Sequence, residues 1–155
     1  MAVVEARFGA DLRLLADLER QSERERGADL VTRRDPQGLV DLETLAGVGN
    51  LEQALLLRFM THVGELADLG HPSYGSRLPE LIGELNTETN RNRAKMFVLQ
   101  ALSEEPRVEE VVSVTVSTSP RDRTRVDVAV SARVLGSDTA LNLVFPFFLE
   151  GGGPA

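Results

Sequence analysis

The chain has 155 residues, of which 42% are hydrophobic and 26% charged, as is typical of a soluble globular domain. Its net charge of −7, from 17 Lys and Arg against 24 Asp and Glu, argues against a dedicated nucleic-acid binder or a protein drawn to anionic lipid. The chain has no Cys and two His, which excludes thiolate chemistry and a His-rich metal centre, so we expect no metal and no cofactor.

The first 38 residues predict short strands around a charged stretch. Apolar and polar residues alternate at first in 9–16, which predicts a short strand, and residues 29–35 could form another. Residues 17–27 are almost wholly charged and predict a solvated loop or helical turn. Pro36 and Gly38 then break the pattern. We treat residues 1–38 as a variable N-terminal segment.

A first helix is predicted from Asn50 to Met60. Asn50 is a good N-cap, and Gln53 stands three residues later, as in a capping box. Apolar residues at helical spacing form a wide stripe, which predicts burial on most sides: Leu51, Leu55, Leu56, Phe59 and Met60.

Two further helices follow an ordered loop at 61–75. Ser76 can cap a second helix, with Pro79 in its first turn, where a missing N–H is tolerated. A third helix is expected from Thr87 to Ser103, because Pro106 disfavours helix at the residue before it.

The last third of the chain changes from helical to strand periodicity and predicts a three-stranded antiparallel meander. The inward-facing residues expected in the three strands are Val112, Val114 and Val116; Val126, Val128, Val130 and Val134; and Leu141, Leu143, Phe145, Phe147 and Leu149. Pro146 cannot donate to a central ladder, so the last strand should be an edge. The prediction is an α+β fold, with a three-helix layer packed on the meander, in one domain over 1–155 with a disordered tail at 150–155.

The corner between the third helix and the first meander strand is a candidate binding site. Pro106 fixes the backbone and Arg107 emerges beside Glu105, where a guanidinium can bond a carboxylate. Two interpretations remain open here: a structural corner closed by a local salt bridge, or a surface that docks a partner chain. The apolar last strand leaves a similar choice, between pairing with a partner strand and being covered in cis by residues 29–34.

Catalytic patterns are weak. His71 lies in a tight loop without a nucleophile beside it, so packing is the simpler interpretation. Glu65, Asp68 and Glu84 are the least unsuitable carboxylates for a glycosidase, which needs two at a defined separation. The glycines of 47–50 lack the Lys of a phosphate-binding loop and the third Gly of a dinucleotide fingerprint.

Several motifs in this order resemble the GPW-type baseplate wedge family of contractile injection systems. They are GVGNLEQALLLRFMT, GHPSYGSRLPELIG, EEPRV and the ending LNLVFPF, and the resemblance covers about residues 39–149. Members include the sheath-initiating wedge protein of contractile-tail phages and the type VI secretion subunit TssE. The ending looks most like the forms in extracellular phage-tail-like systems.

The resemblance implies a structural, non-enzymatic subunit that assembles in the cytoplasm, in six copies per baseplate. Its partners would be other wedge proteins, sheath subunits, and hub or inner-tube proteins. Wedge-core docking would fall to Glu105, Pro106 and Arg107. The sheath-facing residues would be Tyr74 and Gly75 in the central loop and Asn142, Val144 and Pro146 on the last strand. The alternatives are a lysozyme-type cell-wall hydrolase and an adaptor in another complex.

Overall fold

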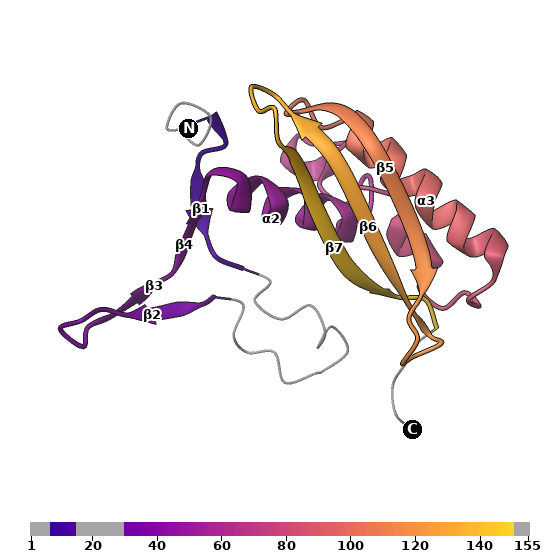
Figure 1. The fold of residues 1–155 in the computed structure, drawn as a ribbon, viewed down its shortest axis with the longest axis horizontal. Helices are drawn as coiled ribbons and strands as arrows, with labels where there is room; N and C mark the ends of the chain where they lie inside the picture. The colour runs from indigo at the N-terminus through magenta and orange to yellow at the C-terminus, as the bar shows by residue number, and fades with distance from the viewer. Residues whose placement is uncertain (1–6, 15–29, 151–155) are drawn as a thin grey trace. The chain divides into compact units, whose positions relative to one another are not determined.

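The computed structural model describes residues 7–14 and 30–150 of the chain (Figure 1). The predicted charged loop at 17–27 and the tail beyond residue 150 lie outside these ranges. The chain divides into two compact units, Met1–Ala54 and Leu55–Ala155. The single domain expected over 1–155 stays a prediction. Within the described ranges, no helix has both the length and the apolar character needed to cross a membrane.

The first unit contains two small antiparallel pairs of strands. β1 (Ala10–Leu12) pairs with β4 (Thr44–Ala46), and β2 (Thr32–Arg34) pairs with β3 (Val40–Leu42). The strands predicted within 9–16 and 29–35 are therefore confirmed, although each is only three residues long. Strand β2 pairs with β3, and among the described strands it does not pair with the last strand.

Helix α2 (Gly47–Met60) begins three residues earlier than predicted, and its polar residues do not form the expected capping box. The Asn50 side chain donates from Nδ2 to the Phe8 carbonyl oxygen at 2.8 Å. Gln53 donates from Nε2 to the Leu12 carbonyl at 2.8 Å and accepts from the Leu14 N–H at 2.7 Å. Backbone groups of the N-terminal segment thus bind both side-chain amides. These backbone groups need hydrogen-bond partners, so they compete with the local cap of the helix.

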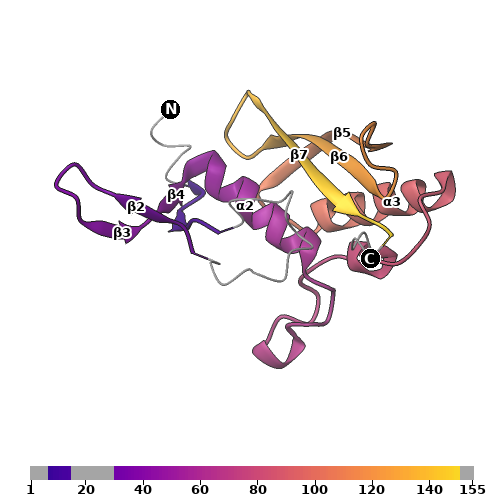
Figure 2. The same cartoon turned by 90° about the horizontal axis from the view of Figure 1, so that it is seen from below.

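The second unit is built on a three-stranded sheet with the order β5–β6–β7, which confirms the predicted meander (Figure 1). Its strands are β5 (Val108–Thr118), β6 (Arg125–Val134) and β7 (Ala140–Phe148). Helix α3 (Glu88–Ser103) packs on one face, as Figure 2 shows from below. The rings of Phe59 and Phe145 stack on this face with centroids 5.3 Å apart, joining the end of α2 to β7.

Residues 30–150, all of which the structure describes, contain two α-helices, so the predicted three-helix layer is wrong. The segment expected to form the second helix is a 3-10 turn at Leu78–Leu81. Pro79 is tolerated in that first turn, but the backbone of Ile82 is extended and Gly83 has a φ of +94°. These two conformations stop the segment after one turn, despite its apolar spacing.

Helix α3 follows the prediction at both ends. The Thr87 side chain accepts a hydrogen bond from the Asn90 N–H at 3.2 Å and so caps the first turn. The C-cap is Glu104, two residues before Pro106. The inward face of the helix is buried: Ala94, Phe97, Val98, Ala101 and Leu102.

Val112 is the one predicted inward-facing valine of the first meander strand that turns away from the core. It is 58% exposed, whereas Val114 is 3% exposed. Register shifts between Val108 and Glu110 and between Val111 and Ser113 explain the difference. An extra residue in one strand reverses which face the next side chain takes, so simple alternation fails there. The predicted inward residues of β6 and β7 are all buried.

Strand β7 is hydrogen-bonded to β6 alone among the described strands, so it is an edge, as Pro146 predicts. The Leu149 N–H donates to the Thr124 carbonyl at 2.9 Å, and the register pairs Val126 with Phe147. Because backbone groups alternate in direction along a strand, the N–H groups of Asn142 and Val144 point away from β6.

Candidate functional site

The candidate site is the short connection between α3 and β5. The Glu105 N–H donates to the Leu102 carbonyl at 3.1 Å, and the Val108 N–H donates to the Glu105 carbonyl at 3.0 Å. These two bonds hold Pro106 on an exposed corner and turn the Glu105 side chain inward, where it is 4% exposed. The tight turn thus buries a carboxylate, which requires compensating partners.

Two arginines share the Glu105 carboxylate. Arg107 donates from Nε to Oε1 at 2.6 Å, and its backbone N–H reaches the same oxygen at 3.3 Å. Arg58, on α2, donates from Nη2 to Oε2 at 3.2 Å. The local ion pair considered for this corner is therefore present, and it includes an additional cation from a distant helix. Partner docking at the corner stays a prediction.

The arrangement of these charges shifts the pKa values of Glu105 and Arg107. Burial by itself raises the pKa of Glu105, but the hydrogen bonds and charge of Arg107, with the charge of Arg58, outweigh it and leave the pKa lowered. The hydrogen bond to Glu105 raises the pKa of Arg107. Both shifts favour the charged forms of Glu105 and Arg107.

Arg58 is the residue of this candidate site that sequence reasoning did not identify. Its guanidinium carbon lies 4.6 Å from the centroid of the Tyr74 ring, so the central loop and the corner meet through this side chain. Burial raises the pKa of Tyr74, and the charge of Glu105 adds to this, while Arg58 and Arg107 oppose it. The sequence signal that could have identified Arg58 is its place directly beside Phe59, within the apolar stripe of the predicted helix.

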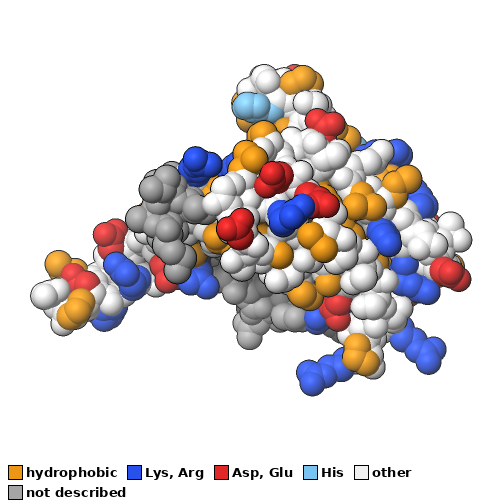
Figure 3. Space-filling model, turned by 45° about the horizontal axis from the view of Figure 1, so that its top comes forward, with side chains coloured by type: hydrophobic (Ala, Val, Ile, Leu, Met, Phe, Trp, Pro, Cys, Tyr) orange, Lys and Arg blue, Asp and Glu red, His pale blue; other side chains and the backbone are white. Residues whose placement is uncertain are grey.

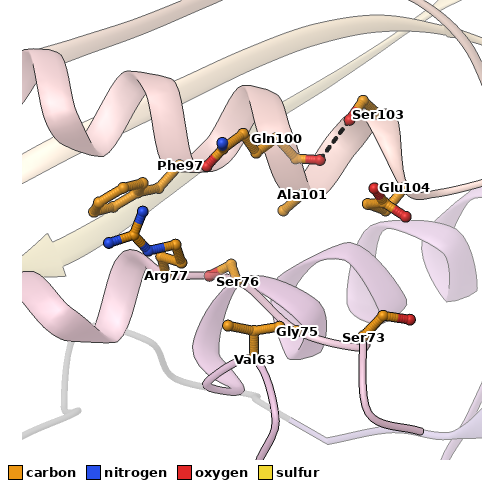
Figure 4. A pocket seen from close by; sticks show the side chains of 10 residues that line it. All are labelled: Val63, Ser73, Gly75, Ser76, Arg77, Phe97, Gln100, Ala101, Ser103 and Glu104. Carbon is orange, nitrogen blue, oxygen red and sulfur yellow. Dashed lines mark hydrogen bonds between the residues drawn. The ribbon is translucent and has the colours of Figure 1, made fainter.

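Two hollows lie beside the corner and share Ser73 and Glu104 in their linings. The larger, of about 420 Å³, is bounded by the C-terminal half of α3 and by residues of the 63–77 loop (Figure 4). Within it, the Arg77 guanidinium lies over the Phe97 ring at 4.7 Å from the centroid. The smaller, of about 220 Å³, includes Arg58 in its lining. The candidate site is therefore a surface with two hollows next to the hydrogen-bonded corner between α3 and β5.

Gly75 has a clear structural requirement. Its φ is +114°, and a Cβ there would lie 2.6 Å from the Thr61 carbonyl oxygen. The Ser76 N–H donates to that same oxygen at 2.8 Å, which holds the two segments together. Only glycine fits this backbone approach. Its predicted contact with sheath stays untested.

The structure divides the predicted site residues into two groups. Tyr74 and Gly75 lie near Glu105, Pro106 and Arg107, in the linings or contacts just described. The remaining three, Asn142, Val144 and Pro146, belong to β7. Asn142 and Val144 are exposed, whereas Pro146 is buried. The edge strand is therefore a separate candidate surface.

The carboxylates considered for glycoside hydrolysis lie outside both hollows. Glu65, Asp68 and Glu84 are all exposed, and none lines either hollow. Glu65 accepts a hydrogen bond from the backbone N–H of His62 at 3.1 Å. His71 lines the smaller hollow and is exposed. Among the described residues, no group of three or more His, Asp or Glu could hold a metal ion.

Charge on the visible surface is mixed. Figure 3 shows acidic and basic side chains on the same face, with apolar side chains scattered between them. A face on which both signs mix in this way produces no broad field of one sign.

No family model and no curated protein sequence matches the chain. Among solved structures, it is similar to a crystal structure of a "putative tail lysozyme" from Geobacter sulfurreducens. The two share 26% sequence identity with a TM-score of 0.56, over 67% of this chain and 92% of the other. The chain thus shares an α+β fold, over two thirds of its length, with a protein whose name places it in a tail.

Proposed function

We propose that this protein is a non-enzymatic structural subunit of the baseplate wedge in a phage-tail-like contractile injection system. The observation that carries the proposal is the corner itself, where a buried Glu105 holds Arg107 and Arg58, and Arg58 lines the smaller hollow. The structural likeness to a protein named for a tail supports the same direction. Docking on the wedge core would use the corner formed by Glu105, Pro106 and Arg107.

Preorganisation is what the corner contributes to docking. The Arg107 side chain is 32% exposed, yet its Nε is fixed on the Glu105 carboxylate. A partner that accepts from the remaining guanidinium N–H groups would not have to order this long side chain itself. The entropic cost of fixing this side chain on binding is therefore smaller.

Sheath initiation would use the edge of β7 that faces away from β6. The N–H groups of Asn142 and Val144 are directed to that edge, where an added strand can accept from them. The last strand also lacks the Lys residues that commonly prevent edge pairing. Six copies per baseplate would follow from the sixfold symmetry that the family resemblance implies.

The name of the structural neighbour favours a second candidate, a lysozyme-type hydrolase. Such an enzyme needs an acid and a second carboxylate flanking one bond. The buried acid of the site, Glu105, has a lowered pKa and holds two arginines, which is the opposite of a general acid. The geometry therefore favours the structural role.

The docking proposal is tested by comparing Arg107→Ala with Arg123→Ala in a pull-down with co-produced wedge proteins. Truncating one partner of a charge-assisted interface pair costs roughly 2 to 5 kcal/mol, so Arg107→Ala should lose binding at least about thirtyfold. Arg123 is exposed on the β5–β6 turn, and its removal should change binding by less than about threefold.

Circular dichroism and thermal melting accompany both variants, since Arg107 also contacts Glu105 within the chain. Equal binding by the two variants would reject the corner as the dock. Unfolding of Arg107→Ala would assign the motif a purely structural role. Failure of the wild-type protein to bind any wedge component would favour the adaptor alternative.

A further inference from the structure

Arg58 is a buried guanidinium with unused hydrogen-bonding capacity. The residue is 8% exposed, and its Nε–H has no acceptor. A guanidinium carries five N–H donors, and the one described hydrogen bond of this side chain is Nη2 to Glu105 at 3.2 Å. Buried donors are normally paired, so an orphan of this kind requires an explanation.

The cluster around Arg58 also carries an uncompensated charge. Arg58 and Arg107 are both paired with Glu105, and no other anion forms an ion pair with either arginine in the described part of the chain. Two positive charges and one negative charge leave the cluster at +1. A buried or half-buried cluster of this kind favours a further anion.

The cluster borders a space that can admit such a group. Arg58 lines the hollow of about 220 Å³, together with His71, Ser73, Tyr74 and Glu104. That volume is several times the share of one water molecule, roughly 30 Å³. Of these lining residues Glu104 is the only acid, and it is exposed, so water screens its repulsion more than it screens the buried guanidinium.

We propose that this hollow binds one carboxylate side chain, an Asp or Glu, of the partner protein that docks on the corner. The carboxylate accepts from the terminal Nη N–H groups of Arg58, because the Nε–H is itself inaccessible, and it balances the surplus charge shared with Arg107. Ser73 and His71 supply further donors at the rim. The inference rests on the proposed function for the partner's identity, but the carboxylate site itself can be tested on the isolated protein.

The probe is acetate, compared with neutral acetamide of similar size at constant ionic strength. In ¹⁵N-labelled full-length protein, the Nε–H resonance of Arg58 should shift with acetate along a saturating curve and stay in place with acetamide. The resonance of the exposed Arg123 serves as the reference and should not saturate. An absent shift, or equal shifts with both probes, would overturn the carboxylate site.

Two variants test the electrostatic argument with opposite signs and leave Arg58 in place. Arg107→Gln removes the surplus charge and should weaken acetate binding about tenfold, comparable to one charge-assisted hydrogen bond. Glu104→Gln removes the repulsive acid and should tighten binding about twofold to threefold. Changes in the reverse directions, or no change in either variant, would refute the assignment.

Docking is then measured separately with the wedge proteins. Competition by acetate, but not by acetamide, against the wild-type complex would place the partner's carboxylate in the hollow. Docking that is insensitive to acetate, while acetate binds the isolated protein, would overturn the inference about the partner. Acetate binding without any wedge docking would reject the proposed function while the carboxylate site stands.

Discussion

Replacing Glu105 with Gln tests whether one buried carboxylate organises the corner. Glu105→Gln keeps the size of the side chain but leaves Arg58 and Arg107 without their shared anion. Removing one partner of a buried ion pair costs about 3 to 5 kcal/mol. We expect about 3 kcal/mol, since Arg107 is partly exposed to water, which lowers the cost of leaving it unpaired.

For a chain of this length, about 3 kcal/mol corresponds to a fall of roughly 6 to 12 °C in Tm. Urea denaturation with a shared m-value gives the free energy of unfolding of each variant. Glu109→Gln is the matched control, because Glu109 is an exposed residue of β5 in the same part of the chain. The control should remain within about 0.5 kcal/mol of the wild-type protein.

The effect should depend on pH with a definite sign. The folded-state pKa of Glu105 is lowered, so its contribution to stability is fully present above the ordinary glutamate pKa, about 4.3. The contribution is lost as the pH falls through the lowered folded-state value. The gap between wild type and Glu105→Gln should therefore be largest near pH 7 and smaller near pH 3. A gap below about 1 kcal/mol at pH 7, or one unchanged at pH 3, would refute this account.

Three further predictions address other parts of the molecule. Asn142→Pro should block sheath polymerisation on assembled baseplates while Asn142→Ser, which keeps the edge N–H, should permit it; equal sheath assembly would contradict strand pairing at β7. Purified protein should clear no peptidoglycan suspension, and clearing that is lost in Glu65→Gln would establish the hydrolase instead. Gly75→Ala should destabilise by about 2 kcal/mol or more, against about 1 kcal/mol for Gly70→Ala, where no atom lies within 4 Å of the added Cβ; equal melting temperatures would show that the loop relaxes.

The sequence by itself determined the elements whose signals are local. Period-two alternation located the three meander strands, and Pro146 placed the last of them at an edge. Pro106 predicted where α3 ends, because a helix stop acts within one turn. The charged corner was also visible, since its three residues are adjacent in the chain.

The tertiary structure decided what depended on distant partners. Asn50 and Gln53 look like capping residues, yet backbone groups some forty residues away take their side chains. Val112 breaks its alternation because the pairing with β6 shifts register. Arg58 becomes part of the corner only when α2 brings it to Glu105, across 47 positions. Sequence periodicity reports which side of an element is apolar, but it carries no information on which polar groups from separate elements will meet when those sides pack.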